Sequence, residues 1–224
     1  MTYCGLPRTT PAYLAVLAAN NDRTWFEAHR DQYQRDWLAA GLDLIEAVAP
    51  LLATQAPRLL AVPKLNQSLR RIHRDVRFSA DKRPYDPALH LIFSTGPAFN
   101  KVPGFHLVLW ADTLAWGAGW YGLGPADLDR YRHRVSDPTE RGALMAALAA
   151  AAAAGSDLDP PDLARLPQGY AAPADWGHLL RRRGLIARTQ VPQRVPGWLF
   201  TEHAPRQIEQ LIGGHRPLLG WLTA

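Results

Sequence analysis

Cysteine is almost absent from this sequence, which excludes a fold held together by disulfide bonds. The chain has 224 residues and one cysteine, Cys4. One cysteine cannot form a bridge within the chain, so the fold depends on its core. A chain of this length can bury roughly two-thirds of its unfolded surface, which is sufficient. Intracellular proteins keep their thiols reduced, so the composition favours a cytoplasmic location.

Long hydrophobic runs are also missing. We find no apolar run of the ~20 residues that a membrane-spanning helix needs. The first residues lack the basic start and apolar centre that are typical of a signal peptide. The alanine-rich run at 146–154 is short and weakly apolar. We therefore expect a soluble protein that has no membrane partner.

Motifs of the common enzyme classes are missing as well. There is no P-loop and no HExxH, and no serine–histidine–aspartate or cysteine–histidine set can be assigned. His73, His90 and His106 fall on expected strands, but without tight ligand spacing we assign no metal. GAGWYGLG (117–124) is similar to a nucleotide-binding loop but lies in an expected strand hairpin. The sequence therefore leaves any cofactor unknown, and the reaction and oligomeric state stay open.

Lysine is scarce, so arginine supplies nearly all of the positive charge. Only three of the 25 basic side chains are lysine, and the net charge is +5. Residues 70–83 hold six of these cations against two aspartates, a local net charge of +4, while the rest of the chain has 19 cations and 18 acids. A local excess indicates an anion site better than a high isoelectric point does. The six cations are Arg70, Arg71, Arg74, Arg77, Lys82 and Arg83.

The order of the expected elements favours an α+β fold, because helices come first, strands cluster in the middle and helices follow. We expect a central antiparallel sheet flanked by helices, in a single domain over 1–224. Alternation at 69–78 predicts a further short strand that leads into a loop. The expected helices cover 11–20, 22 to Pro50 or soon after with a break near Gly41, 125–135, 137–155, 173–184, 204–214 and 215–223. The main expected strands cover 89–95, 105–111, 113–122 and 185–191, and glycines in the third suggest close backbone approach or a bulge.

The stretch RRIHRDVRFSADKRPYD, at 70–86, has the composition of an anion-binding loop. The planar guanidinium of arginine binds carboxylate or phosphate through two parallel hydrogen bonds, and several together can hold a multiply charged group. A tyrosine at the end of the stretch could add a hydroxyl donor. We therefore predict a small phosphorylated or carboxylated ligand. The predicted ligand-binding residues are Arg71, Arg74, Arg77, Lys82 and Tyr85.

Two acids lie among these cations and are the candidate catalytic residues. Asp75 and Asp81 could orient the arginines, or one could act as a general base. Two other interpretations stay open. The arginines and aspartates could form a network that only locks the fold of a structural or partner-binding domain. Alternatively, the protein could be a nucleic-acid-binding module, if this stretch and RRRG at 181–184 share one face.

The cationic stretch resembles the signature of a mostly bacterial family, domain of unknown function 2461. Further resemblance lies in NNDRTWFEAHRDQY (20–33), GAGWYGLGPADLDRYRHRV (117–135) and LARLPQGYAAPADWGHLLRRRGL (163–185), and it covers nearly the whole chain. It implies a shared fold and a shared site, but no established activity, substrate or cofactor. Pro87 departs from the family pattern, which has a polar or basic residue there. The matching signature positions are Arg71, Arg74, Asp75, Arg77, Phe78, Asp81, Lys82 and Tyr85.

Overall fold

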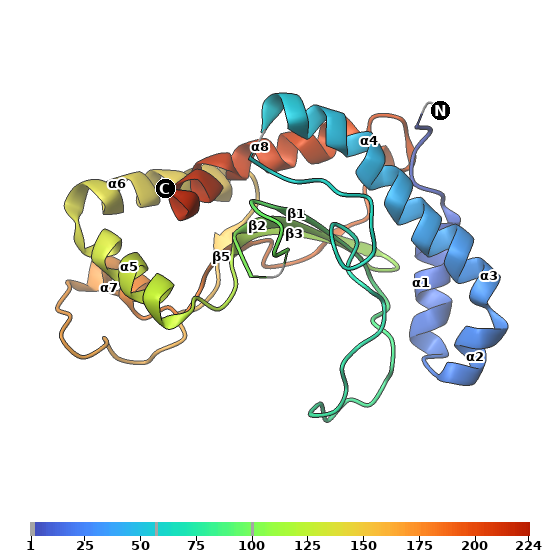
Figure 1. The fold of residues 1–224 in the computed structure, drawn as a ribbon, viewed down its shortest axis with the longest axis horizontal. Coiled ribbons are helices and arrows are strands. Elements are labelled where there is room, and N and C mark those ends of the chain that lie inside the picture. The colour runs from blue at the N-terminus through green and yellow to red at the C-terminus, as the bar shows by residue number, and fades with distance from the viewer. Residues whose placement is uncertain (1–2, 57, 100) are drawn as a thin grey trace.

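Helices occupy both ends of the chain, and strands occupy its middle (Figure 1). The computed structural model describes residues 3–56, 58–99 and 101–224. The helices are α1 (Thr9–Ala19), α2 (Arg23–Ala28), α3 (Arg30–Gln32), α4 (Ala40–Gln55), α5 (Pro125–Ser136), α6 (Pro138–Ala153), α7 (Ala174–Leu180) and α8 (Ala204–Thr223). The strands are β1 (Leu89–Ser94), β2 (Gly104–Leu109), β3 (Thr113–Trp120), β4 (Asp157–Leu158), β5 (Leu185–Arg188) and β6 (Gln193–Arg194).

The strands form one antiparallel sheet, and the predicted α+β single-domain fold is confirmed. In the described residues the sheet has six strands in the order β1-β2-β3-β5-β4, with β6 paired to the other end of β3. The three long strands are consecutive hairpins, in which Leu107 stands opposite Leu91 and Trp116. β4 and β6 are two-residue strands that the sequence pattern did not predict.

Two glycines in β3 let β5 come unusually close. A Cβ atom on Gly119 would lie 2.2 Å from the carbonyl oxygen of Leu185, and one on Gly117 would lie 2.5 Å from that of Ala187. Neither distance is possible for a real side chain, so only glycine fits at both positions. The close backbone approach predicted from the sequence is present.

A long helical rod covers one face of the sheet. It consists of α3, a π-helical segment (Tyr33–Ala39) and α4, and it continues past Pro50 to Gln55. The expected break near Gly41 is absent. Instead, Gly41 makes room for a side chain of the sheet, since a Cβ there would come within 2.9 Å of Leu89 Cδ1.

By length and composition the rod Arg30–Gln55 could cross a membrane, so the expectation that no segment is apolar enough was too strict. Its apolar face is nevertheless used inside the protein. Trp37, Leu44, Ile45 and Val48 are at most 1% exposed and belong to the main core. The rod therefore serves as a core helix of the fold.

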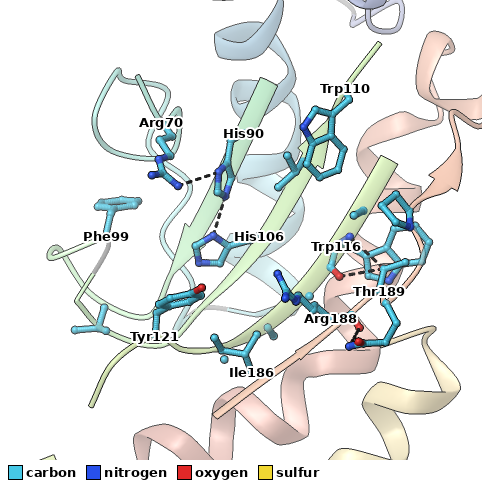
Figure 2. A pocket seen from close by; sticks show the side chains of 18 residues that line it. Arg70, His90, Phe99, His106, Trp110, Trp116, Tyr121, Ile186, Arg188 and Thr189 are labelled. Atoms are coloured by element: carbon cyan, nitrogen blue, oxygen red, sulfur yellow. Dashed lines mark hydrogen bonds between the residues drawn. The ribbon is translucent and has the colours of Figure 1, made fainter. Parts of the chain in front are cut away.

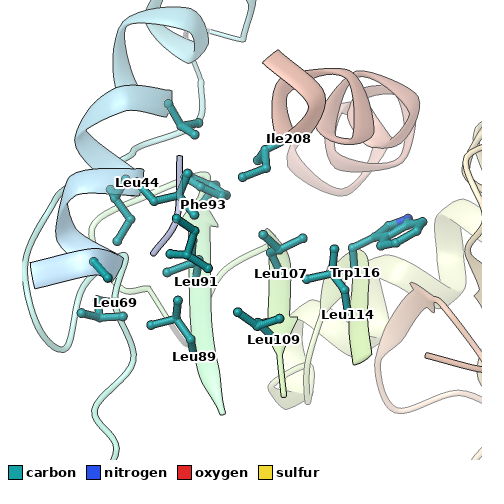
Figure 3. Close-up of a cluster of buried hydrophobic side chains, with 14 of the residues drawn as sticks. Leu44, Leu69, Leu89, Leu91, Phe93, Leu107, Leu109, Leu114, Trp116 and Ile208 are labelled. Atoms are coloured by element: carbon teal, nitrogen blue, oxygen red, sulfur yellow. The ribbon is translucent and has the colours of Figure 1, made fainter. Parts of the chain in front are cut away.

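The core lies on the face of the sheet that α4 and α8 cover (Figure 3). Alternate residues of the strands point into it, including Leu91 from β1, Leu107 from β2 and Leu114 from β3. A second cluster joins α5, α6, α7 and β5, and α8 contributes to both clusters. The predicted cap of α6 is also confirmed, since Asp137 accepts hydrogen bonds from the N–H groups of Thr139 and Glu140.

Residues 71–86 form an extended loop, here called the arm, that projects away from the sheet (Figure 1). The short strand predicted at 69–78 is not formed. Only isolated bridges are present, such as His73 with Tyr85. The backbone N–H of Arg74 donates to Pro84 and that of Asp86 to Ile72, so the two sides of the arm hold each other near its base.

Candidate functional site

The sheet face opposite α4 and α8 is hollowed into a pocket of about 820 Å³ (Figure 2). Because side chains alternate along a strand, the neighbours of the core residues point into it. They are His90 from β1, His106 and Val108 from β2, and Ile186 and Arg188 from β5. The glycines of β3 contribute backbone alone, which makes the floor flat and leaves the space above it empty. We call this space the sheet pocket.

Two histidines form a directed chain of hydrogen bonds at one end of the sheet pocket. Arg70 Nη1 lies 3.5 Å from His90 Nδ1, and His90 Nε2 lies 2.9 Å from His106 Nδ1. A guanidinium only donates, so His90 Nδ1 accepts and neutral His90 carries its hydrogen on Nε2. That hydrogen is donated to His106 Nδ1. His106 therefore carries its own hydrogen on Nε2, where it is available to the pocket.

The surroundings keep both histidines uncharged at neutral pH. Burial lowers the pKa of His106 to about 4, and the positive charge of Arg70 acts in the same direction. Burial also lowers the pKa of His90 well below its usual value, with His106 and Arg70 adding to the effect. Perturbed titratable groups inside a cavity are typical of functional sites.

Two arginines lie at opposite ends of the sheet pocket. The backbone N–H of Arg70 donates to the carbonyl of His90, which places Arg70 beside β1, while Arg188 lies on β5. Arg188 Nε donates to Asp159 at 2.7 Å, and its terminal nitrogens make no hydrogen bond within the described residues. Within the described residues the side chain of Arg70 makes no ion pair and one hydrogen bond, to His90, whereas Arg188 is paired with Asp159. The described lining of the pocket contains no aspartate or glutamate.

Aromatic rings surround the opening of the sheet pocket. Trp110 follows β2, Tyr121 follows β3, and Phe99 belongs to the β1–β2 connection. Tyr121 is 72% exposed, which is high for a large apolar ring and leaves its face free for a ligand. Such rings, combined with a few polar groups, are typical of small-molecule sites.

The predicted arginines of the arm are engaged with the predicted acids. Arg77 and Asp75 form a two-pronged ion pair at 2.7 and 3.0 Å. Asp81 accepts from both Arg74 and Arg83, each at 2.8 Å. The structure therefore joins these side chains within the arm, but none of them lines the sheet pocket.

These ion pairs make the two acids poor bases. Hydrogen bonds from the Arg77 side chain and backbone lower the pKa of Asp75 to about 2. Hydrogen bonds from Arg83, with a smaller contribution from Arg74, hold the pKa of Asp81 well below its usual range. A carboxylate with such a low pKa has little affinity for a proton at neutral pH, which argues against a general-base role.

The other predicted ligand-binding residues have different surroundings. Lys82 donates to the backbone carbonyls of Val76 and Arg77, and Arg71 is exposed. Tyr85 is buried at the base of the arm, 3% exposed, with its ring stacked on Phe26 at 4.1 Å. Its position is structural, since it fixes the arm to the helices.

Asn21 provides the second attachment of the arm. Its side chain accepts from the Tyr85 backbone N–H at 3.0 Å and donates to the Tyr85 carbonyl at 2.9 Å. These two hydrogen bonds therefore connect two segments that lie far apart in the sequence, 20–33 and 71–86. Both segments carry the family resemblance, and in the fold they are in contact.

Only part of the basic cluster at 181–183 reaches the surface. Arg182 is 3% exposed and Arg181 donates to the carbonyl of Ala164, while Arg183 is exposed. The cluster follows α7, which lies at the left end of the long axis in Figure 1, whereas the arm descends from right of the centre. The two basic stretches are therefore well separated along that axis.

Sequence reasoning weighed the histidines of the sheet pocket as metal ligands and assigned no metal. His90 and His106 stand diagonally across β1 and β2, and no group of three histidine, cysteine, aspartate or glutamate side chains suited to a metal occurs in the part of the chain that the structure describes. Their alternation with core leucines was a usable signal. It places both on the sheet face opposite the leucine core, and the glycines of β3 lie on that same face.

The chain was also compared with known proteins. No curated protein and no solved structure matches it. The model of one family, described as conserved hypothetical protein (DUF2461), matches residues 9–221, nearly the whole chain. This confirms the resemblance seen in the sequence, and the chain belongs to the DUF2461 family of conserved hypothetical proteins.

Proposed function

We propose that this protein binds a small organic anion, phosphorylated or carboxylated, in the sheet pocket. One observation carries the proposal. The pocket of about 820 Å³ has an arginine at each end, two neutral histidines on its wall, and no acid in its described lining. The class of ligand is the one predicted from the sequence, but the proposed binding site is the sheet pocket and not the arm.

The size of the sheet pocket supports a small molecule. Ligand sites for drug-sized molecules usually enclose roughly 300–1,000 Å³, are mostly apolar and carry a few polar groups that fix orientation. The sheet pocket has these features, with Val108 and Ile186 as apolar wall. A nucleic-acid track receives less support because Arg182 of the second basic stretch is buried and arginines of the arm are paired with aspartates.

The hydrogen-bond chain supports an anionic group next to Arg70. A guanidinium whose described partner is a neutral imidazole keeps most of its donors for a ligand, and it binds carboxylate or phosphate through two of them. His106 adds an uncharged N–H donor. A group bound there would therefore meet a cation and a neutral donor on the same side.

The arm has a different proposed role, which is structural. Its arginines and aspartates satisfy one another, and Tyr85 and Asn21 tie it to the helices. This corresponds to the interpretation in which the network locks the fold. We also propose a cytoplasmic location, which the single cysteine supports.

Binding of anilinonaphthalene sulfonate tests the location of the site. This probe combines a ring system with one anionic group and becomes fluorescent in apolar surroundings. We expect Arg70→Gln to weaken its binding about ten-fold or more, the usual value of a charge-assisted hydrogen bond. Arg77→Gln removes the same charge from the arm and is the matched control, with unchanged binding expected.

Thermal unfolding must first show that both variants fold like the parent protein. Binding that falls equally in the two variants would contradict the proposal, since it would indicate a response to overall charge. Binding lost only in Arg77→Gln would return the site to the arm.

A further inference from the structure

The charges of the sheet pocket are arranged in a way that specifies the shape of its ligand. Arg70 and Arg188 occupy opposite ends, with His90 and His106 next to Arg70 (Figure 2). The rest of the span is apolar or backbone surface, made of Val108, the two β3 glycines and Ile186. We propose, resting on the function proposed above, that the ligand is an elongated dianion with one acidic group at each end and an apolar middle.

Sheet geometry gives the length of such a ligand. Arg70 pairs with His90 on β1, and β1, β2, β3 and β5 then follow in order. Neighbouring strands lie about 4.8 Å apart, so the backbones of Arg70 and Arg188 are about 19 Å apart. Each side chain extends inward over the sheet, as Figure 2 shows, so the two acidic groups of the ligand are closer together than that.

Arg188 is positioned to receive the second acidic group. Its Nε–H donates to Asp159, which does not line the pocket, and its two terminal nitrogens make no hydrogen bond within the described residues. Gln190 donates to the same carboxylate at 3.4 Å and to the Arg188 carbonyl at 3.2 Å, which adds to the fixed geometry. Asp159 is therefore a positioning residue, and Arg188 is the contact residue.

The floor between the two arginines favours an apolar chain or a flat ring. At Gly117 and Gly119 the backbone of β5 replaces side chains, so no side chain rises from β3 at these positions to divide the pocket. A polar middle would lose hydrogen bonds to water without replacement. An apolar middle gains from leaving water instead.

Calorimetric titration with straight-chain dicarboxylates, from succinate to dodecanedioate, tests this inference when each is paired with the monocarboxylate of equal length. We expect affinity to rise with length to an optimum. At the optimum the diacid should bind about ten-fold or more tightly than the monoacid, because it gains a second charge-assisted contact. Arg188→Gln should reduce the affinity for the diacid to that for the monoacid, and it should leave the affinity for the monoacid unchanged within about two-fold.

The variants separate this inference from the proposal on which it rests. Diacids that bind no better than monoacids at any length would overturn the inference alone, provided that Arg70→Gln still weakens both. Monoacid binding that is unchanged in Arg70→Gln, or no binding by any member of the series, would overturn both the inference and the proposed function. Arg83→Gln, which removes an exposed arginine from the arm, should change neither series.

Discussion

The arm and the sheet pocket both concentrate positive charge, but they differ in what stands beside it. In the arm, Arg77 faces Asp75, and Arg74 and Arg83 share Asp81. In the sheet pocket, Arg70 faces a neutral histidine and makes no ion pair within the described residues. Arg77 and Arg83 each hold an aspartate through both Nε and a terminal nitrogen, whereas Arg188 in the sheet pocket gives only its Nε to Asp159. On the proposed account, the donors that an arginine has left, more than the local number of arginines, decide where an anion binds.

Solvent separates the histidines of the sheet pocket from the arm. The arm projects into water, which screens its charges, and Phe78 there is 96% exposed. Arg70 and Arg188 are exposed as well, but His90 and His106 are enclosed by protein, where the effective dielectric constant is lower. Burial there lowers the pKa of both histidines.

The largest effect on stability should come from filling the floor of the sheet pocket. Gly119→Ala places a Cβ against the Leu185 carbonyl, so β5 must move, and we expect a loss of about 3 kcal/mol or more in the free energy of unfolding. Gly220→Ala in α8 is the matched control. Its Cβ would meet nothing within 4 Å, so it should stabilise by about 0.5–1 kcal/mol. Chemical denaturation measures both, and equal effects would contradict the close approach of β3 and β5.

A somewhat smaller effect should follow from acid. His106 is kept neutral in the fold, so the unfolded chain takes up a proton first as the pH falls. The contribution of neutral His106 to the free energy of unfolding is fully present above the unfolded pKa of 6.5. It is lost as the pH falls toward about 4, and the loss is at most about 3 kcal/mol. His106→Gln should flatten this slope, whereas His203→Gln at an exposed position should leave it intact. Denaturant titrations at several pH values measure the slope, and an unchanged slope in His106→Gln would refute the assignment.

The arm should respond less, because its ion pairs are partly exposed. Arg74→Ala removes one of the two arginines that hold Asp81, and such a pair contributes about 0.2–1 kcal/mol. Limited proteolysis should then cleave the arm faster, while ligand binding in the sheet pocket stays the same. A loss of several kcal/mol would mean that the arm supports the core more strongly than its exposure indicates.

The smallest effect should come from the tip of the arm. Phe78→Ala removes an aromatic ring that is 96% exposed and whose only described ring contact is with Arg77 at 5.8 Å. Neither the unfolding midpoint nor the binding of anilinonaphthalene sulfonate should change. A clear loss of binding would show that the arm takes part in the site.

The sequence predicted the fold better than the site, for physical reasons. Alternating and helical periods record which face of an element is buried, so β1 to β3 and the capped helix α6 were found. The site depends instead on side-chain partners that lie far apart in the sequence. Arg70 and Arg188 are separated by more than half of the chain, and only the order of the strands brings them to one pocket. The sequence could not show the pairing inside the arm, because its acids and arginines are neighbours in the sequence and their contacts depend on the conformation of the loop.

The most direct test of the account is to map a bound anion by nuclear magnetic resonance. Decanoate, added to the isotope-labelled protein, should shift the ring nitrogen signals of His90 and His106 and the amide signals of Gly117 and Gly119. The amide signals of the arm should stay in place. Shifts concentrated at Arg77 and its neighbours, with the histidine signals unmoved, would contradict the account and place the anion on the arm.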